Sequence, residues 1–203
     1  MAKNADVKRQ KILEAARRRF AHYGMAKTTM AEIAQDLSFS KALLYYYFPD
    51  KNRLYAAVLE YTVDEMVTES NQRIDEQKNI EDAVKVFLEV RLEIIKENYS
   101  IFEYTYSFRS DFPPDLEEAC SSIFKKDIEQ AQLILERGVA NKEIVVEDLP
   151  LTARIFMISI LGMRIGVIKE FKNLFIPPTK EEFDYILSLQ KKLAKIFING
   201  LRP

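Results

Sequence analysis

Three consecutive tyrosines, Tyr45, Tyr46 and Tyr47, are the residues of this 203-residue sequence whose chemistry is easiest to interpret. Successive residues of an α-helix point about 100° apart, so three adjacent rings cannot all be buried on one helix. A phenol hydroxyl can donate a hydrogen bond to a phosphate oxygen, and its ring can contact a sugar or a thymine methyl group. The run is therefore typical of a surface that meets nucleic acid.

Polar residues on both sides of the tyrosines extend this surface. Lys51 begins a predicted helix, where its ammonium and the helix-terminal amides can bind one phosphate together. Thr28 and Thr29 have the same position at the start of an earlier predicted helix. The predicted DNA contacts are Thr28, Thr29, Ser40, Lys41, Ala42, Leu43, Tyr45, Tyr46, Tyr47 and Lys51.

Two short predicted helices, over residues 28–37 and 41–48, must position these groups. Thr29 and Glu32 have the spacing of a capping box at the start of the first helix. Ser40 can cap the second helix. Two helices this short and this close along the chain leave room only for a tight turn between them.

Apolar residues on one side of each short helix predict how the pair packs. Leu44 and Phe48, four residues apart, would face the preceding helix while the tyrosines point outward or to the rim. Their expected partners are Ile33, Ala34 and Leu37, with Phe39 filling the turn. Two such helices, apolar on one side and polar on the other, constitute a helix-turn-helix.

The whole chain has a helical pattern, with only five glycines and seven prolines to interrupt it. No strand pattern and no internal repeat is present, so we predict an all-α fold of about nine helices. Apolar residues recur at helical spacing over residues 7–23, 28–37, 41–48, 51–73, 80–98, 101–109, 113–138, 150–171 and 180–199. Gly24 fits the C-terminus of the first of these helices.

The distribution of charge also separates the first quarter of the chain from the rest. Residues 1–55 hold eleven Lys or Arg against five Asp or Glu, a net charge of +6, and the remainder has a net charge of −7. Such asymmetry is expected when one end of a protein meets a polyanion, although surface charge also serves solubility.

Residues 9–55 resemble the DNA-binding part of the TetR family of regulators. The resemblance rests on an ordered set of stretches: Ile12-Leu13-Glu14-Ala15-Ala16, Phe20, Gly24, Thr28 to Ala34, Ser40 to Phe48, Asp50-Lys51 and Leu54. Family members usually have glycine where this chain has Ser38, at a position that tends to need a left-handed backbone. Leu43 replaces the threonine often seen there, so any base contact at that position would be apolar.

The resemblance implies a DNA-binding domain over residues 1–52 and a helical ligand-binding and dimerisation domain over residues 53–203. For the dimer, Gly162 and Gly166 lie four apart in an apolar run and would admit a second helix. The expected interface residues are Ile158, Gly162, Gly166, Leu193 and Phe197. The alternative is that these helices fill the core of a monomer.

The family also implies a pocket for a small molecule in the second domain. The expected ligand contacts are Phe87, Arg91, Phe102, Tyr106 and Phe124, with an aromatic-rich stretch around Tyr106. Aromatic rings at helical spacing are also ordinary core. Arg91 lies on an apolar face, as Arg164 does, and a buried arginine there needs an anionic partner: a ligand carboxylate or an internal acid such as Glu103. Alternatively, its long side chain could reach solvent.

The residues offer little to an enzyme. His22 is the only histidine, no glycine-rich phosphate loop is present, and no cluster has metal-ligand spacing, so we expect no catalytic residue, metal or cofactor. Cys120 is the only cysteine, and a packing role is a simpler interpretation of it than redox sensing. Because no disulfide can form within the chain, we expect a reducing compartment. The apolar run from Ile155 to Ile168 is shorter than a membrane span, and we expect a cytoplasmic protein.

The sequence therefore predicts a sequence-specific transcriptional regulator. As a homodimer it would bind an inverted repeat in double-stranded DNA. The family implies a repressor that an unknown small-molecule effector releases through a shift between two conformers. The alternatives are a helical ligand-binding or adaptor protein without specific DNA binding, and a protein of the membrane surface, for which the basic end lacks an apolar-plus-basic face.

Overall fold

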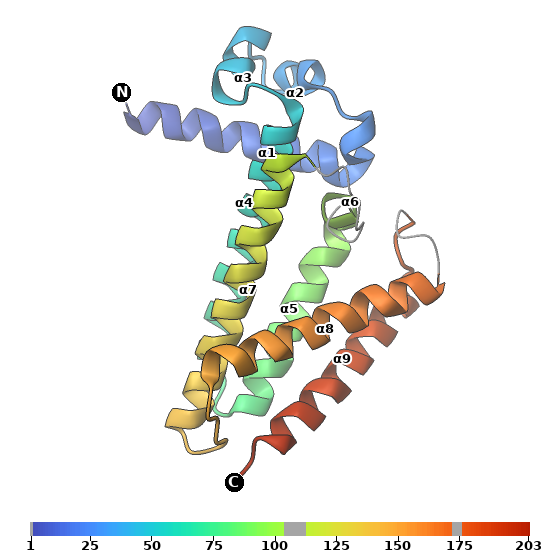
Figure 1. The fold of residues 1–203 in the computed structure, drawn as a ribbon. Helices are drawn as coiled ribbons and strands as arrows, with labels where there is room; N and C mark the ends of the chain where they lie inside the picture. The colour runs from blue at the N-terminus through green and yellow to red at the C-terminus, as the bar shows by residue number, and fades with distance from the viewer. Residues whose placement is uncertain (1, 104–112, 172–175) are drawn as a thin grey trace. The chain divides into compact units, whose positions relative to one another are not determined.

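The computed structural model describes residues 2–103, 113–171 and 176–203 (Figure 1). This part of the chain contains nine helices and no strand, which confirms the all-α prediction. The helices are α1 (Ala2–Lys27), α2 (Met30–Asp36), α3 (Lys41–Tyr47), α4 (Lys51–Asp75), α5 (Ile80–Glu97), α6 (Tyr99–Phe102), α7 (Pro114–Ala140), α8 (Leu149–Phe171) and α9 (Lys180–Gly200).

The chain folds into two compact units. The first, the head unit, consists of residues 1–64 and 97–122; the second, the body unit, consists of residues 65–96 and 123–203. Helices α4 and α7 each contribute residues to both units. The predicted boundary at residue 52 separates a DNA-binding domain from a ligand-binding domain by function, so the compact units do not test it and it stays a prediction.

In the head unit, α6 is attached to α1 and α4 by polar contacts. The hydroxyl of Tyr55 in α4 donates to the carbonyl oxygens of Ile101, at 2.7 Å, and Ser100, at 3.2 Å. Nε of Arg17 in α1 donates to Oδ1 of Asn98, at 3.2 Å, immediately before α6. The ring of Tyr55 also meets Phe20 of α1 edge to face, with centroids 5.0 Å apart. Because these groups are largely buried, the contacts fix α6 firmly to the head helices.

The regular geometry of helix α1 is interrupted at Gly24, the position that the sequence predicted. Gly24 has φ 74° and ψ 168°, which interrupts the helix before its last residues. A positive φ of this size suits glycine, which has no Cβ to clash with the backbone. The prediction that Gly24 marks the helix C-terminus is confirmed.

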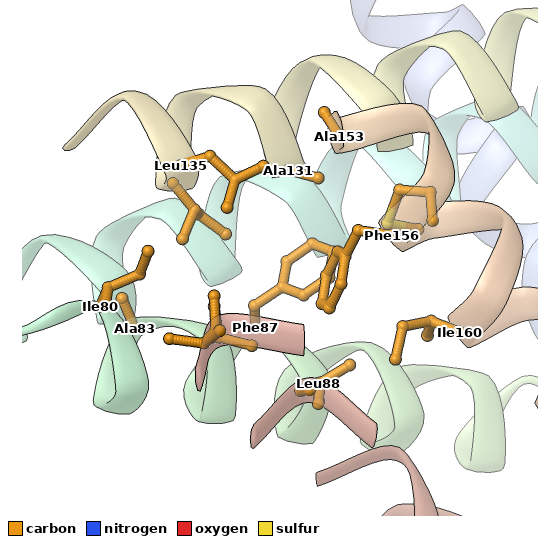
Figure 2. Close-up of a cluster of buried hydrophobic side chains, with 14 of the residues drawn as sticks. Ile80, Ala83, Phe87, Leu88, Ala131, Leu135, Ala153, Phe156 and Ile160 are labelled. Atoms are coloured by element: carbon orange, nitrogen blue, oxygen red, sulfur yellow. The ribbon is translucent and has the colours of Figure 1, made fainter. Parts of the chain in front are cut away.

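The core of the body unit is built around Phe87 of α5, which is completely buried (Figure 2). The rings of Phe87 and Phe156 of α8 lie 6.4 Å apart, and Phe156 lies 5.2 Å from Phe197 of α9. Figure 2 shows Ala131 and Leu135 of α7 on the same cluster. Four helices therefore bury their apolar faces together, which is how amphipathic helices gain most of their stability.

One expectation about α8 is wrong. The apolar run extends beyond Ile155–Ile168, and Leu149–Glu170 is long and apolar enough to cross a membrane by length and composition. A core helix of a soluble protein meets the same criteria. Helix α8 places Ala153, Phe156 and Ile160 in the core cluster, so packing accounts for part of its apolar character.

Candidate nucleic-acid interface

Both short helices of the head unit begin with the predicted caps. Oγ1 of Thr29 accepts from the amide of Glu32 at 3.3 Å, and a carboxylate oxygen of Glu32 accepts from the amide of Thr29 at 2.9 Å. The hydrogen bonds from Thr29 hold the pKa of Glu32 below its usual range, so the cap is charged near neutral pH. Oγ of Ser40 accepts from the amide of Leu43 at 3.1 Å and starts α3. The capping predictions are confirmed.

The turn between α2 and α3 places Ser38 in the left-handed region, with φ 54°. The left-handed backbone that the family resemblance implied at this position is confirmed. The amides of Ser38 and Phe39 donate to the carbonyls of Gln35 and Ala34, at 3.0 and 2.9 Å, which closes the turn. Serine adopts this conformation at a cost that glycine avoids.

We expect Ser38→Gly to stabilise the protein by about 0.5–1 kcal/mol. The left-handed conformation costs an L-residue about 1–2 kcal/mol, and the greater freedom of glycine in the unfolded chain offsets part of that gain. Urea unfolding would measure the difference. The matched control is Ser121→Gly in the exposed middle of α7, which should lose stability because glycine is a poor helix former. A loss at both positions would contradict the expectation for Ser38.

The two helices pack through the residues that the sequence indicated. Leu44 and Phe48 are buried on α3, and Ile33 and Ala34 are buried on α2. Leu37 and Phe39 are half-buried near the turn. The guanidinium of Arg9 in α1 lies over the Phe48 ring, 5.5 Å from its centroid. The inner side of the helix-turn-helix is thus fixed by apolar contacts, and Figure 1 shows α2 and α3 adjacent to each other.

The outer side of α3 exposes the tyrosines. Tyr46 is 80% exposed and Tyr45 49% exposed, and Lys41 and Ala42 are also exposed. Leu43 and Tyr47 are half-buried. The Tyr46 and Tyr47 rings meet edge to face, with centroids 5.3 Å apart. We call these exposed residues, Lys41, Ala42, Tyr45 and Tyr46, the α3 face. Their exposure leaves the face accessible to another molecule.

Two predicted DNA contacts, Thr28 and Lys51, lie differently from expectation. Thr28 is fully buried, and its hydroxyl donates to the carbonyl of Gly24 at 2.9 Å, so its side chain does not face solvent. Nζ of Lys51 donates to the carbonyls of Met25, at 2.9 Å, and Thr28, at 3.2 Å. Lys51 therefore closes the C-terminal end of α1, where free carbonyls attract a cation. The side chain of Thr28 is corrected to a packing residue.

Comparison with known proteins agrees with this geometry. Residues 12–58 match the family described as bacterial regulatory proteins, tetR family. The crystal structure of a transcriptional regulator from Cytophaga hutchinsonii ATCC 33406 is similar over 97% of this chain and 99% of that chain, with 27% identity and a TM-score of 0.83.

Two further proteins are similar over nearly the whole chain. The nucleoid occlusion factor SlmA of Vibrio vulnificus is 24% identical over 196 residues, which cover 91% of this chain and 96% of that protein. FadR of Bacillus subtilis, solved in complex with stearoyl-CoA, shares the fold with a TM-score of 0.68 at 15% identity, over 95% of this chain and 99% of that one.

Residues 12–58 belong to the TetR family. The chain is a DNA-binding transcriptional regulator, and the matched residues contain the helix-turn-helix of α2 and α3. Over nearly its full length it also has the same fold as the Cytophaga regulator.

The sequence did not reveal one ion pair that links α1 to α2 in this TetR-family head. Arg19 of α1 donates two hydrogen bonds to the carboxylate of Asp36 in α2, from Nε to Oδ2 at 2.5 Å and from Nη2 to Oδ1 at 2.8 Å. The pair lowers the pKa of Asp36 and raises the pKa of Arg19. Its contribution to stability is therefore present above the ordinary pKa of an aspartate and is lost as the pH falls through the lowered value. No local pattern predicts it, because seventeen residues separate the partners.

The structure places the predicted ligand contacts in different units. Phe87 and Arg91 lie together on α5, where the guanidinium covers the ring at 5.1 Å, and Phe124 of α7 is half-buried in the same unit. Phe102 is buried in the head unit. Tyr106 lies outside the described residues. Arg91 meets an internal acid, as one alternative held, but the acid is Asp127 rather than Glu103.

The predicted dimer residues divide between surface and core. Ile158 is 50% exposed, and a Cβ added at Gly162 or Gly166 would meet nothing within 4 Å. Leu193 and Phe197 are half-buried and pack on the body core. The exposed side of α8 also carries Leu151 and Ile155. Sequence reasoning missed these two, although both lie at helical spacing from Ile158 or Gly162.

Proposed function

We propose that this TetR-family regulator binds an inverted-repeat operator as a homodimer and represses transcription until a small-molecule effector releases it. The α3 face carries this proposal, because it presents large amphipathic side chains on a helix that caps and packing hold in place. Lys41 adds a cation at the start of the same helix. Such a helix suits the major groove, where side chains near its N-terminus contact base edges.

The exposed tyrosines would contribute both position and specificity. The hydroxyls of Tyr45 and Tyr46 can donate to phosphate oxygens, while the rings and Ala42 can contact thymine methyl groups. Thr29 and Ser40 already use their hydroxyls as helix caps, so phosphate would be bound mainly by backbone amides at those helix starts.

Lys51 contributes to the same proposal indirectly. Two of its three possible hydrogen bonds go to carbonyls of the head unit, which leaves one ammonium hydrogen for a phosphate. We therefore propose that Lys51 mainly holds the end of α1 in place and adds a single phosphate contact.

Dimerisation through α8 and α9 is supported by the apolar surface of α8. Leu151, Ile155 and Ile158 are each about half exposed, and Gly162 and Gly166 leave the helix backbone open to a close neighbour. A second copy would bury these residues and hold two recognition helices on one duplex. On α9, Ile196 is 64% exposed and Tyr185 49% exposed, so both helices have apolar residues to cover.

We expect Gly162→Leu to hinder dimerisation, because a leucine would hold apart two helices that approach through glycine. The side chain has room in the isolated chain, so the fold should be unchanged. Sedimentation velocity would report a shift towards monomer. Gly200→Leu, at another open glycine near the end of α9, is the matched control and should remain dimeric. A fully dimeric Gly162→Leu protein would favour the monomer-core alternative for this stretch.

The fold shared with FadR, which was solved with stearoyl-CoA, supports an effector site in residues 53–203. An effector shifts the equilibrium between two conformers only by its difference in affinity for them. Release from DNA would follow when, in the effector-bound conformer, the distance between the two recognition helices no longer matches the spacing of the operator half-sites.

We propose no catalytic role for this cytoplasmic regulator. Burial raises the pKa of the Cys120 thiol to about 11, so the thiol stays protonated near neutral pH and is a poor nucleophile. This supports a packing role for Cys120. His22 is exposed on α1, beside the ring of Tyr23 at 4.4 Å.

Selection of bound sequences from random duplex DNA at near-physiological salt tests the proposed function. Enrichment of an inverted repeat would support a sequence-specific dimer, and its place upstream of a gene would identify the regulated pathway. Absence of enrichment, with weak binding that disappears as salt rises, would favour the ligand-binding or adaptor protein instead.

A further inference from the structure

A buried polar network joins three helices of the body unit. Nη2 of Arg91 in α5 lies 2.6 Å from Oδ1 of Asp127 in α7, and Nη1 of Arg91 donates to Oε1 of Gln130 at 3.4 Å. Nε2 of Gln130 in turn donates to Oδ1 of Asn71 in α4 at 2.8 Å. Arg91 and Asp127 are each only 6% exposed. Buried charges in such a place need complete pairing and hydrogen bonding to be stable.

The network is not complete among the described residues. Oδ1 of Asp127 accepts no hydrogen bond despite its short distance to Arg91, so the pair is an ionic contact without good hydrogen-bond alignment. Oγ of Ser70, next to Asn71 on α4, is fully buried and also has no hydrogen-bond partner there. Groups of this kind are uncommon in native proteins and need an explanation, such as a ligand that completes them.

The two ends of the ion pair are held unequally. The guanidinium of Arg91 is fixed by Gln130 and by the face of the Phe87 ring, 5.1 Å away, in addition to Asp127. Asp127 has its ionic contact with Arg91 and accepts no hydrogen bond at Oδ1. If the pair separates, Arg91 keeps its contacts with Gln130 and Phe87 and stays in place. The group that replaces Asp127 must then be an anion.

We propose that the effector is an amphipathic anion, whose carboxylate or phosphate takes the place of Asp127 on Arg91. The proposal rests on the proposed function, because it names the chemical class that the effector site accepts. The anion would receive charge-assisted hydrogen bonds from the guanidinium of Arg91. An aliphatic tail would lie against the apolar buried face of α5, and the packed side chains of that face, Phe87 and Leu88 among them, would have to separate to admit it.

Displacement of Asp127 also gives the effector a mechanical consequence. The Arg91–Asp127 pair ties α7 to α5 inside the body unit. Helix α7 continues into the head unit through residues 114–122. Once Asp127 leaves Arg91, α7 loses one of its ties to α5 while its core contacts through Ala131 and Leu135 remain, and a rigid helix carries any small shift along its own length.

Calorimetric titration with octanoate, octylammonium and octanol tests the class of effector, because the three share one chain and differ in headgroup charge. We expect octanoate alone to bind the wild-type protein. In Arg91→Met/Asp127→Leu, which replaces the pair with apolar residues and so keeps the fold, octanoate affinity should fall about tenfold or more. In Asp127→Asn, which removes the competing carboxylate, octanoate should bind more tightly.

Lys85→Met is the matched control, because it removes one positive charge from the exposed side of the same helix. Lys85 lines a groove of about 160 Å³ between α5 and α9, together with Lys191 and Lys195. Loss of octanoate binding in Lys85→Met, but not in the double variant, would assign the anion to that groove and overturn the proposal. So would no binding of octanoate, or preferential binding of octylammonium. If octanoate binds through Arg91 but no duplex is ever selected, the anion site stands and the proposed function fails.

Discussion

Replacing Tyr46 by alanine is expected to weaken operator binding by about 1–3 kcal/mol, the size of one good base contact, without unfolding the protein. Tyr46 is 80% exposed and its ring meets Tyr47 edge to face, so the head unit loses little packing when the ring is removed. The loss should appear as faster dissociation, because a contact inside the interface mainly sets the off-rate. Fluorescence anisotropy with the selected operator would measure it.

Two companion variants separate the causes of that effect. Tyr46→Phe keeps the ring and removes the hydroxyl, so an intermediate loss would assign part of the energy to a hydrogen bond with phosphate. Tyr23→Ala removes another tyrosine of the head unit, 52% exposed on α1, and should bind the operator normally. Unchanged affinity in Tyr46→Ala would refute the role of the α3 face at this position.

The largest effect on stability is expected from Phe87→Ala, which should cost about 3–5 kcal/mol. Phe87 is completely buried and lies against Phe156 (Figure 2). It also carries the guanidinium of Arg91 on its face. The smaller side chain leaves a cavity that neighbouring helices can fill only in part, so lost burial and lost packing add together.

Urea unfolding monitored by circular dichroism would measure this cost. Lys85→Ala, two residues away on the exposed side of α5, is the control and should change stability by less than about 0.5 kcal/mol. A cost below about 1 kcal/mol for Phe87→Ala would mean that the core collapses around the gap or is already loosely packed at this point. In that case Phe87 would be better interpreted as the wall of a pocket than as the centre of the core.

The local structure of the head could be predicted from sequence because its determinants are close together in the chain. The caps at Thr29 and Ser40 each involve a residue three positions away, whereas the left-handed turn at Ser38 was expected from the family resemblance. Helical periodicity indicated that Leu44 and Phe48 face inward. The exposure of Tyr45 and Tyr46 follows from the same period, since neighbours of a buried residue on a helix point elsewhere.

Contacts between distant parts of the chain could not be predicted in the same way. The sequence by itself determined the all-α fold, the positions of most helices and the side of α3 that faces outward, because short-range spacing and helical period decide these. Only the tertiary structure decided that Thr28 is buried, that Lys51 closes the end of α1, and that Asp127 pairs with Arg91. The physical reason is that a buried charge requires a partner, but many acids satisfy that requirement, and only the packing of the helices determines which one lies within reach.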